Sequence, residues 1–509
     1  MTTRRAVLLL IAAFALAVAL VNPIGNFPLN DDWGVGFTTF TLLHTGTIEF
    51  TPFASATAYL QFVWGALWAS VFGESFTVLR FATLTLSLGS TLLAFFLLRR
   101  AVSAPIAMLG AFALLFHPLF FWASFTSMTH VPFVFLSLLA CTAFVKAWER
   151  EGVWLAMAFL VCIASFFTRQ FAILNAVAPF LVALTLRRKK IAITYAAAMA
   201  VFAALVLSGV LVASQKELVL HRPAFDGAKL AMRASHYFFF HWQNAALFFA
   251  PILLMRKAKL SRITMAVCAV IFAYAAIRMT AIGAPIPYMN SGNVFTDFGL
   301  GPPTLRDVFT WRMAHPFALP FAVKVALMVV TTAGAVIAAG ALPVREENVL
   351  VRFAVVYLIC GSLVAAFMKI NFDRYSIDTA WPFIFLLAAG PLRRRPAAAV
   401  ATLVILAMFA VCGTSEYLAW NRARWDAYAF LRANGVTLEQ MDAGYEVNSM
   451  LALREGRKDL GKSGVGVVDD RFVLTFRRDI PGYRMLRAFA YPRWLGLSHG
   501  AVHVQMRAP

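Results

Sequence analysis

Two adjacent aspartates, Asp31 and Asp32, are the first acidic residues of the chain, and their position suits acid–base chemistry. They follow a turn rich in Pro, Gly and Asn, in the run NPIGNFPLNDDWGVGF. Neighbouring carboxylates repel each other, so at least one of them tends to keep its proton to a higher pH, as a general base near neutrality requires. An Asp before WGVGFTTFTLL also suits the N-terminal cap of a helix, so both interpretations stay open.

Two other patterns resemble functional sites but fit them poorly. HYFFFHWQN places His236 and His241 five residues apart. Three or four would align them on one helical face, so this run favours an aromatic-rich membrane edge over a shared metal. GRKDLGKS (456–463) matches the P-loop pattern, which needs a helix after it to hold phosphates. The glycine-broken, strand-like GVGVVDD follows instead, and we interpret the segment as a solvated turn.

The composition excludes a soluble protein and predicts a membrane protein. Of the 509 residues, 61% are hydrophobic and 14% are charged, whereas soluble domains are about 45–50% apolar and about 25% charged. The net charge of +21 sits in short loops between apolar runs, so it indicates membrane orientation and not nucleic acid as the partner. The five cysteines all fall in apolar runs, where a thiol packs as a small apolar group.

Apolar runs predict a bundle of about thirteen membrane-spanning helices, since a helix needs roughly 20 apolar residues to cross the hydrocarbon core. The runs lie near 6–21, 78–98, 102–121, 129–146, 153–168, 170–186, 191–213, 236–255, 263–282, 319–342, 353–371, 376–391 and 396–413. The first run follows Arg4–Arg5 and could be a cleaved signal peptide, but no clear cleavage site follows it. We therefore expect a retained anchor.

Short basic loops predict the orientation of this bundle. Seven short segments on one side, from Arg4–Arg5 to Arg393–Arg395, hold 19 Lys and Arg residues but four acids. Short loops dense in Lys and Arg stay cytoplasmic. The N-terminus is therefore expected in the cytoplasm. The C-terminal residues and the loop 22–77 with its acidic pair are expected outside, at the periplasmic face of a bacterial inner membrane.

The end of the chain has a different character and is expected to form a second domain. After Cys412, Gly, Arg, Asp and Tyr become more frequent, and RFVLTF (471–476) is of strand length. WDAYAFLRANGV (425–436) predicts a short helix that stops at Gly435. We therefore divide the chain into a membrane domain, 1–413, and a small α/β domain outside, 414–509.

An acidic pair just after the first helix resembles the GT-C superfamily of membrane glycosyltransferases. More closely, the sequence is similar to bacterial members akin to protein O-mannosyltransferases and lipid A aminoarabinose transferases. Three further segments carry the resemblance, which extends roughly to residue 420: YLQFVWGALWASVFGESFTVLRF with Gln61, Gly73 and Arg80, FTRQFAIL with Arg169 and Gln170, and NFDRYSIDTAWP with Asp373, Arg374 and Tyr375. The chain departs from the family in FTSMTHVPF, where His130 stands at a position that is usually an acid.

The resemblance implies an enzyme that moves a hexose or pentose from a polyprenyl-phosphate donor to a lipid, glycan or protein acceptor on the outer face, with inversion. Because the phosphate is the leaving group, a fixed cation should face it, and an Arg fork suits phosphate better than Lys. Arg374 is the first choice, although it could instead be an interfacial anchor. Lys216 and Arg222 are further cations on this side.

The site residues that follow from the resemblance fall into three groups. They are the catalytic pair Asp31 (general base) and Asp32, the phosphate-binding candidates Arg374, Arg169 and Tyr375, and the substrate-binding candidates Gln61, His130 and His236. No cofactor is required by this assignment, and a divalent metal stays open, because the departure at His130 changes the set of acids. Membrane lipid is the other expected partner.

Two alternative functions stay open from the sequence alone. A transporter or flippase of lipid-linked glycans predicts polar or Gly/Pro-broken segments at the middle of paired helices, with internal symmetry. The charged residues of this chain gather at the outer rim instead. An outer-face ligase or polymerase of lipid-linked glycans would share the substrates but would centre on a large late loop.

Overall fold

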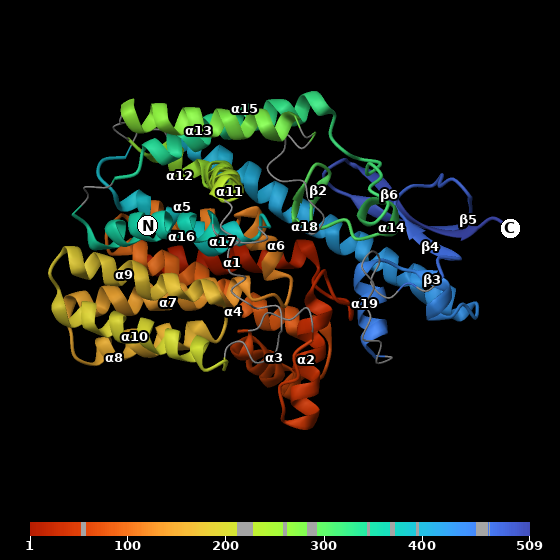
Figure 1. Ribbon diagram of the computed structural model, residues 1–509, viewed down its shortest axis with the longest axis horizontal. Coiled ribbons are helices and arrows are strands. Elements are labelled where there is room, and N and C mark those ends of the chain that lie inside the picture. Colours follow the sequence, from red (N-terminus) through yellow and green to blue (C-terminus); the bar gives the residue numbers. More distant parts are fainter. Residues whose placement is uncertain are drawn as a thin grey trace.

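The computed structural model consists mainly of helices that run side by side, with a small sheet at one end (Figure 1). It describes residues 1–51, 57–210, 227–257, 262–281, 283, 293–343, 347–366, 372–392, 396–454, 467 and 469–509. The N-terminus lies toward the end of the bundle away from the sheet, and the C-terminus lies beyond the sheet. The two ends of the chain therefore lie on opposite sides of the bundle.

Most described residues belong to helices, as the sequence predicts. The helices are α1 (Thr3–Val21), α2 (Asp32–Thr45), α3 (Tyr59–Phe72), α4 (Phe76–Arg99), α5 (Ala104–Leu115), α6 (Pro118–Ser124), α7 (His130–Glu149), α8 (Val153–Phe166), η1 (Gln170–Ile173), α9 (Leu174–Thr185), α10 (Lys189–Leu207), α11 (Gly227–Phe248), α12 (Ala250–Met255), α13 (Arg262–Ala281), α14 (Arg306–Phe309), α15 (Phe321–Gly340), α16 (Val349–Ala366), α17 (Tyr375–Ala380), η2 (Trp381–Ala388), α18 (Pro396–Ala433), η3 (Leu438–Gln440) and α19 (Tyr445–Arg454).

The chain is a multi-pass membrane protein, but fewer described helices meet the length of a full span than the sequence predicts. Eight are long and apolar enough, and the pair α5–α6, bent by 66°, makes a ninth if it counts as one span. The apolar runs at 153–168, 170–186 and 376–391 form helices shorter than 18 residues. At a rise of about 1.5 Å per residue, such helices fall short of a hydrocarbon core of about 30 Å.

The segment between the first two long helices folds across the direction of the bundle. Helices α2 and α3 run roughly at right angles to the long helices (Figure 1). Arg80 of α4 is fully buried and donates hydrogen bonds to the carbonyl oxygens of Pro23 (3.0 Å), Gly25 (2.6 Å) and Phe27. A guanidinium is always charged and has five donors. This one side chain can therefore hold the backbone of residues 23–27, where the segment leaves α1.

The C-terminal part is built on the long helix α18, which runs past the predicted boundary between residues 413 and 414. Its 38 residues give a length of about 57 Å, and about half of that suffices to cross the hydrocarbon core. The predicted short helix at 425–436 is therefore the last part of α18, which ends before Gly435 in the left-handed conformation (φ 80°).

A four-stranded mixed sheet packs against the C-terminal half of α18. Its strands β3 (Met441–Asp442), β4 (Phe472–Thr475), β5 (Tyr483–Arg493) and β6 (Ser498–Arg507) have the order β3-β4-β6-β5. Only the β3–β4 pair is parallel. The predicted strand in RFVLTF is confirmed as β4. A separate two-stranded hairpin, β1 (Phe295–Thr296) and β2 (Gly299–Leu300), comes from the long loop before α15.

Candidate active site

Asp31 lies where three segments far apart in the sequence meet. Its Oδ2 atom is 2.9 Å from Nη2 of Arg374, and its Oδ1 atom accepts a hydrogen bond of 2.8 Å from the hydroxyl of Tyr445. The side chain remains 28% exposed. Asp31 holds the N-cap position of α2 but makes no side-chain cap hydrogen bond, so the capping interpretation of this residue is wrong. Its carboxylate is reachable from solvent and is held by three side chains, since the amide of Asn30 also donates a hydrogen bond of 3.2 Å to Oδ2.

Asp32 faces the opposite way, into the protein. Its Oδ1 atom accepts a hydrogen bond of 2.9 Å from the backbone N–H of Ser127, whose carbonyl accepts one of 2.8 Å from Gln61. Burial raises the pKa of Asp32 to about 7, while the charge of Arg80 opposes the shift. Repulsion from Asp31 is the smallest of the causes. The sequence-based reason for a raised pKa was therefore incomplete, because burial is the main effect.

Arg374 is positioned by Asp373, which organises the backbone around it. The Asp373 carboxylate accepts hydrogen bonds from the backbone N–H groups of Val294 (3.0 Å) and Phe295 (2.5 Å), and from that of Arg374 (2.6 Å). Burial raises the pKa of Asp373 to about 6, although these bonds lower it. The guanidinium of Arg374 lies 4.4 Å from the ring centre of Phe372. Asp373 is therefore a structural residue that ties the β1 hairpin to the start of α17.

A second cluster lies deeper and joins two of the predicted site residues. Asp378 of α17 is fully buried, 2.9 Å from Nε of Arg169 and 3.1 Å from Nδ1 of His130. Arg169 also donates to the hydroxyl of Thr129 (2.7 Å). His130 therefore stands beside an acid from another helix. The charge of Arg169 is balanced by Asp378 inside the protein.

Tyr375 links the two clusters. Its ring centre is 5.0 Å from the guanidinium carbon of Arg169 and 5.7 Å from that of Arg374. Cations within about 6 Å of an aromatic ring are attracted to its face. The structure thus brings together the half-buried Asp31 and Tyr375 with the buried Arg374, with Arg169 and His130 behind them and Gln61 in the network of Asp32.

The C-terminal residues contact this site through Glu446, which forms a buried ion pair with Arg424. Glu446 and Arg424 pair with each other and are both fully buried. Glu446 also accepts a hydrogen bond of 3.0 Å from the backbone N–H of Asn30, the residue before Asp31, and one of 2.6 Å from the hydroxyl of Thr304. Since Tyr445 is the neighbour of Glu446, the same pair sets the positions of both Asp31 and its hydrogen-bond donor.

Several predicted features lie outside the described residues or give no cluster. His236 is in α11, but its side chain is outside the described part, as are Lys216, Arg222 and the P-loop-like segment 456–463. His241 bonds Thr379 through Nδ1 at 2.8 Å. Within the described ranges, no group of three or more His, Cys, Asp or Glu residues could hold a metal ion. Asp31 and Asp32 face different partners.

Sequence reasoning missed Asp378, Glu446 and Tyr445. Asp378 had a signal, because an acid inside a predicted span (376–391) is usually paired and functional. Tyr445 and Glu446 had none, since they follow α18 in a polar tail where nothing in the sequence indicates contact with residue 31. Only the fold brings together residues separated by 414 positions.

Comparison with known proteins places part of this chain in a functional context. Residues 58–212 match the family model described as dolichyl-phosphate-mannose-protein mannosyltransferase. The chain resembles this family of membrane glycosyltransferases. The predicted class, a polyprenyl-phosphate-sugar-dependent glycosyltransferase, is confirmed at the level of this resemblance. The matched segment contains Gln61, Arg80, His130 and Arg169, whereas Asp31 and Arg374 lie outside it.

Solved structures resemble this chain only with low TM-scores and low sequence identity. The Archaeoglobus fulgidus oligosaccharyltransferase in the apo form has a TM-score of 0.49 and 15% identity, over 85% of this chain and 58% of that chain. ArnT from Cupriavidus metallidurans bound to undecaprenyl phosphate has a TM-score of 0.40 and 13% identity, over 99% of this chain and 98% of that chain. This chain thus spans little more than half of the oligosaccharyltransferase. No curated protein matches the sequence.

Proposed function

We propose that this protein transfers a single sugar from a polyprenyl-phosphate donor to an acceptor on the outer face of the membrane, with inversion at the anomeric carbon. The observation that carries the proposal is the pair of Asp31 and Arg374, 2.9 Å apart, in which Asp31 is 28% exposed and Arg374 is buried. A base and a phosphate-binding cation must flank the same sugar phosphate. These two residues meet that requirement although 343 positions separate them.

In the mechanism that we propose, Arg374 and Asp31 both exchange each other for a substrate group. Without donor, Arg374 and Asp31 neutralise each other. When the donor phosphate binds, Arg374 turns its fork toward the phosphate oxygens, which suit a guanidinium in charge and geometry. Asp31 is then free to accept the proton of an acceptor hydroxyl. The acceptor oxygen bonds to the anomeric carbon from one side, and the carbon–oxygen bond to the phosphate breaks on the other.

The remaining residues act around this pair. Tyr445 donates a hydrogen bond to Asp31 and holds it toward the sugar. Tyr375 lies between Arg374 and Arg169, so in this proposal Arg169 supports the phosphate site from behind. Asp32 and Gln61 fix the segment that begins at Ser127 and are positioning residues. His130 serves the same purpose through Asp378, and the role of His236 stays a prediction, as does any divalent metal.

The proposal places the site in the compartment opposite the basic loops. In this orientation the N-terminus is cytoplasmic, and residues 414–509 lie outside as a domain that contributes Tyr445 to the site. The position of the two termini toward opposite ends of the bundle supports this arrangement (Figure 1). The site then opens at the surface where a lipid-linked sugar phosphate is presented. The acceptor is a lipid, glycan or protein in the same compartment.

Incubation of the purified full chain with donors tests the function. The donors are undecaprenyl phosphates that carry mannose, glucose, galactose or glucosamine, offered with membrane lipid extract as acceptor source, and the product measured is free undecaprenyl phosphate. We expect release from at least one donor and none from an Asp31→Asn variant at the same concentration. No release from any donor by the unaltered chain would favour transport or ligation and would overturn the proposal.

A further inference from the structure

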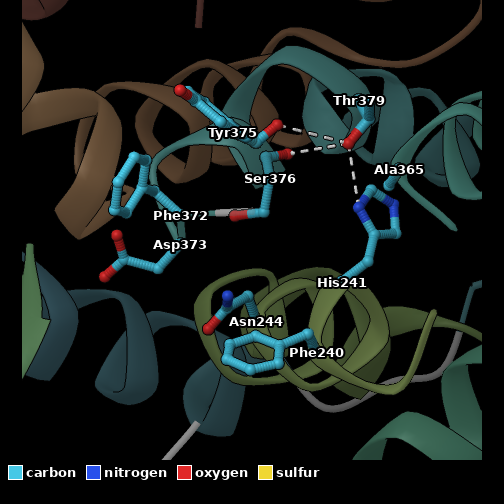
Figure 2. A pocket seen from close by; sticks show the side chains of 9 residues that line it. All are labelled: Phe240, His241, Asn244, Ala365, Phe372, Asp373, Tyr375, Ser376 and Thr379. Carbon is cyan, nitrogen blue, oxygen red and sulfur yellow. Dashed lines mark hydrogen bonds between the residues drawn. The ribbon is translucent and has the colours of Figure 1, made fainter. Parts of the chain in front are cut away.

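A narrow cavity lies beside the candidate site, between α11, α16 and α17 (Figure 2). Asn244 and His241 of α11 face it from one side, and Ser376 of α17 faces it from the other. The rings of Phe240 and Phe372 line it as well. Its free volume is on the order of one water molecule, so in this state it has room for a single small group.

The cavity is lined by polar atoms that have no hydrogen-bond partner among the described residues. Both the Nδ2 and Oδ1 atoms of Asn244 are in this condition, and the residue is fully buried. So are Nε2 of His241 and the hydroxyl of Ser376, in residues that are 3% and 6% exposed. Buried polar groups are nearly always paired, and each exception needs an explanation. Four such atoms around one cavity indicate a polar occupant.

The unpartnered atoms define the chemistry of that occupant. An amide offers two donors and an acceptor, a hydroxyl both donates and accepts, and Nε2 of His241 does one or the other according to the tautomer of the ring. A ligand hydroxyl, itself donor and acceptor, matches this set. The one carboxylate in the described lining, that of Asp373, already accepts three backbone N–H bonds. The described wall thus offers neither a free anion for an ammonium group nor a free cation for a phosphate.

The cavity shares its walls with the proposed phosphate site. Phe372 lines the cavity, and its ring is 4.4 Å from the guanidinium of Arg374. Tyr375 also lines the cavity and lies 5.7 Å from the same guanidinium. Phe372 and Tyr375 therefore belong both to the surroundings of Arg374 and to the wall of the cavity. His241 is held in place by its bond to Thr379, so the wall is preformed.

From this geometry we infer that the cavity receives one hydroxyl-bearing substituent of an uncharged donor sugar, with the amide of Asn244 as the group that recognises it. The inference rests on the proposed function and adds the substrate class. A site built to hydrogen-bond a substrate hydroxyl discriminates strongly against a ligand that lacks it, because its own buried groups are then left unpaired. The enzyme should therefore prefer neutral hexoses over amino sugars at this position.

The test compares the unaltered full chain with Asn244→Leu and Asn244→Asp. Each is measured for kcat/KM with undecaprenyl phosphate that carries mannose, glucose, galactose or glucosamine, and for binding of undecaprenyl phosphate without sugar. For Asn244→Leu we expect a loss of roughly ten- to hundredfold in kcat/KM with the best neutral donor, and sugar-free binding within about threefold of the unaltered chain. For Asn244→Asp we expect a relative shift toward the glucosamine donor. Asn175→Leu, which removes a buried amide bonded to Ser165 in another part of the bundle, is the matched control.

The outcomes separate the two levels of the account. If the unaltered chain releases undecaprenyl phosphate from no donor, the proposed function fails and the inference fails with it. If the unaltered chain is active and Asn244→Leu has the same kcat/KM for each donor as the unaltered chain, the cavity holds only water. The inference alone is then overturned. A loss of sugar-free binding equal to the loss of kcat/KM would also overturn it. Should the Leu variant not fold, the donor preference of Asn244→Asp decides, since an unshifted preference contradicts the inference.

Discussion

Asp31 and Asp32 are neighbours in the chain, yet their surroundings differ and suit them to different roles. Asp31 is partly exposed and paired with Arg374, while Asp32 is buried against the backbone of Ser127. A carboxylate that must meet a substrate needs access, and one that must fix a loop needs burial. The pair is therefore better described as one candidate base and one positioning residue than as two equal catalytic acids.

The burial of Asp32 predicts a pH-dependent stability that Asp32→Asn should remove. The folded protein keeps the Asp32 proton up to a pKa of about 7, whereas the ordinary value is 3.8. Between these values the folded state binds more protons than the unfolded state, so stability falls as pH rises, by at most roughly 1.4 kcal/mol per pH unit. Melting temperatures from pH 5 to 8 should decline less for the variant. Parallel curves would contradict this prediction.

Tyr445 predicts a loss of activity when its hydroxyl is removed. The hydroxyl donates a hydrogen bond to Asp31 and holds the proposed base in place. In Tyr445→Phe we expect kcat/KM to fall about tenfold, equivalent to one hydrogen bond to a charged group, with binding of undecaprenyl phosphate unchanged. Tyr428→Phe, in α18, is the control. An unchanged kcat/KM would limit Tyr445 to a packing role.

The adjacent acids and the family resemblance predicted Asp31, Arg374 and Tyr375 as site residues, but they could not predict which side chains would already be paired inside the protein. Arg169 is conspicuous in the sequence, and it is paired with Asp378 in the fold. His130 stands at a position where the resembled family usually has an acid, and it also contacts Asp378. Partnership of this kind depends on helix packing, which residue patterns do not reveal.

At the scale of elements, α18 and α19 connect the C-terminal sheet to the helical bundle. The buried pair of Arg424 and Glu446 connects these helices, and Glu446 also bonds the backbone of Asn30. Removal of one partner leaves the other charge buried and unpaired, which is strongly unfavourable. The position of the loop that carries Asp31 and the stability of the contact between α18 and α19 are therefore coupled.

This coupling predicts the effect of Glu446→Gln. We expect a loss of about 3–5 kcal/mol of stability, seen as a lower melting temperature in detergent, together with reduced turnover. The double variant Arg424→Met with Glu446→Gln should recover much of the stability, since no charge is left unpaired. Glu151→Gln breaks the exposed pair of Lys190 and Glu151 and should change stability by less than about 1 kcal/mol. Equal effects of the two single variants would argue against the proposed coupling.

Helices were predicted more reliably than the number of spans. Apolar composition indicates which segments enter the membrane, but not whether they cross it. The run at 376–391 is mostly apolar, yet it falls in the short α17 and the 3₁₀ helix η2 and contains the buried Asp378. The boundary of the outer domain was also hard to place, because α18 continues without a break from apolar to polar sequence.

For the whole molecule, sidedness is the property on which the function depends. The basic loops predict one orientation, and impermeant maleimide labelling of single cysteines checks it. In spheroplasts we expect labelling of Glu74→Cys and Asp479→Cys but not of Lys189→Cys, all of which are exposed positions. The five native cysteines are buried or half-buried, which keeps the background low. Labelling of Lys189→Cys alone would show that the orientation is opposite to the predicted one. The proposed site would then lie in the compartment away from its substrate.

The most direct test of the account separates chemistry from phosphate binding at the Asp31–Arg374 pair. It measures kcat for the best donor and Kd for undecaprenyl phosphate in Asp31→Asn and Arg374→Gln, with Asp297→Asn as a control carboxylate from another ion pair. We predict that Asp31→Asn lowers kcat by about 10²–10⁴-fold with Kd unchanged or tighter. We predict that Arg374→Gln weakens Kd by about tenfold or more. Normal turnover by Asp31→Asn, or unaltered phosphate binding by Arg374→Gln, would contradict the account.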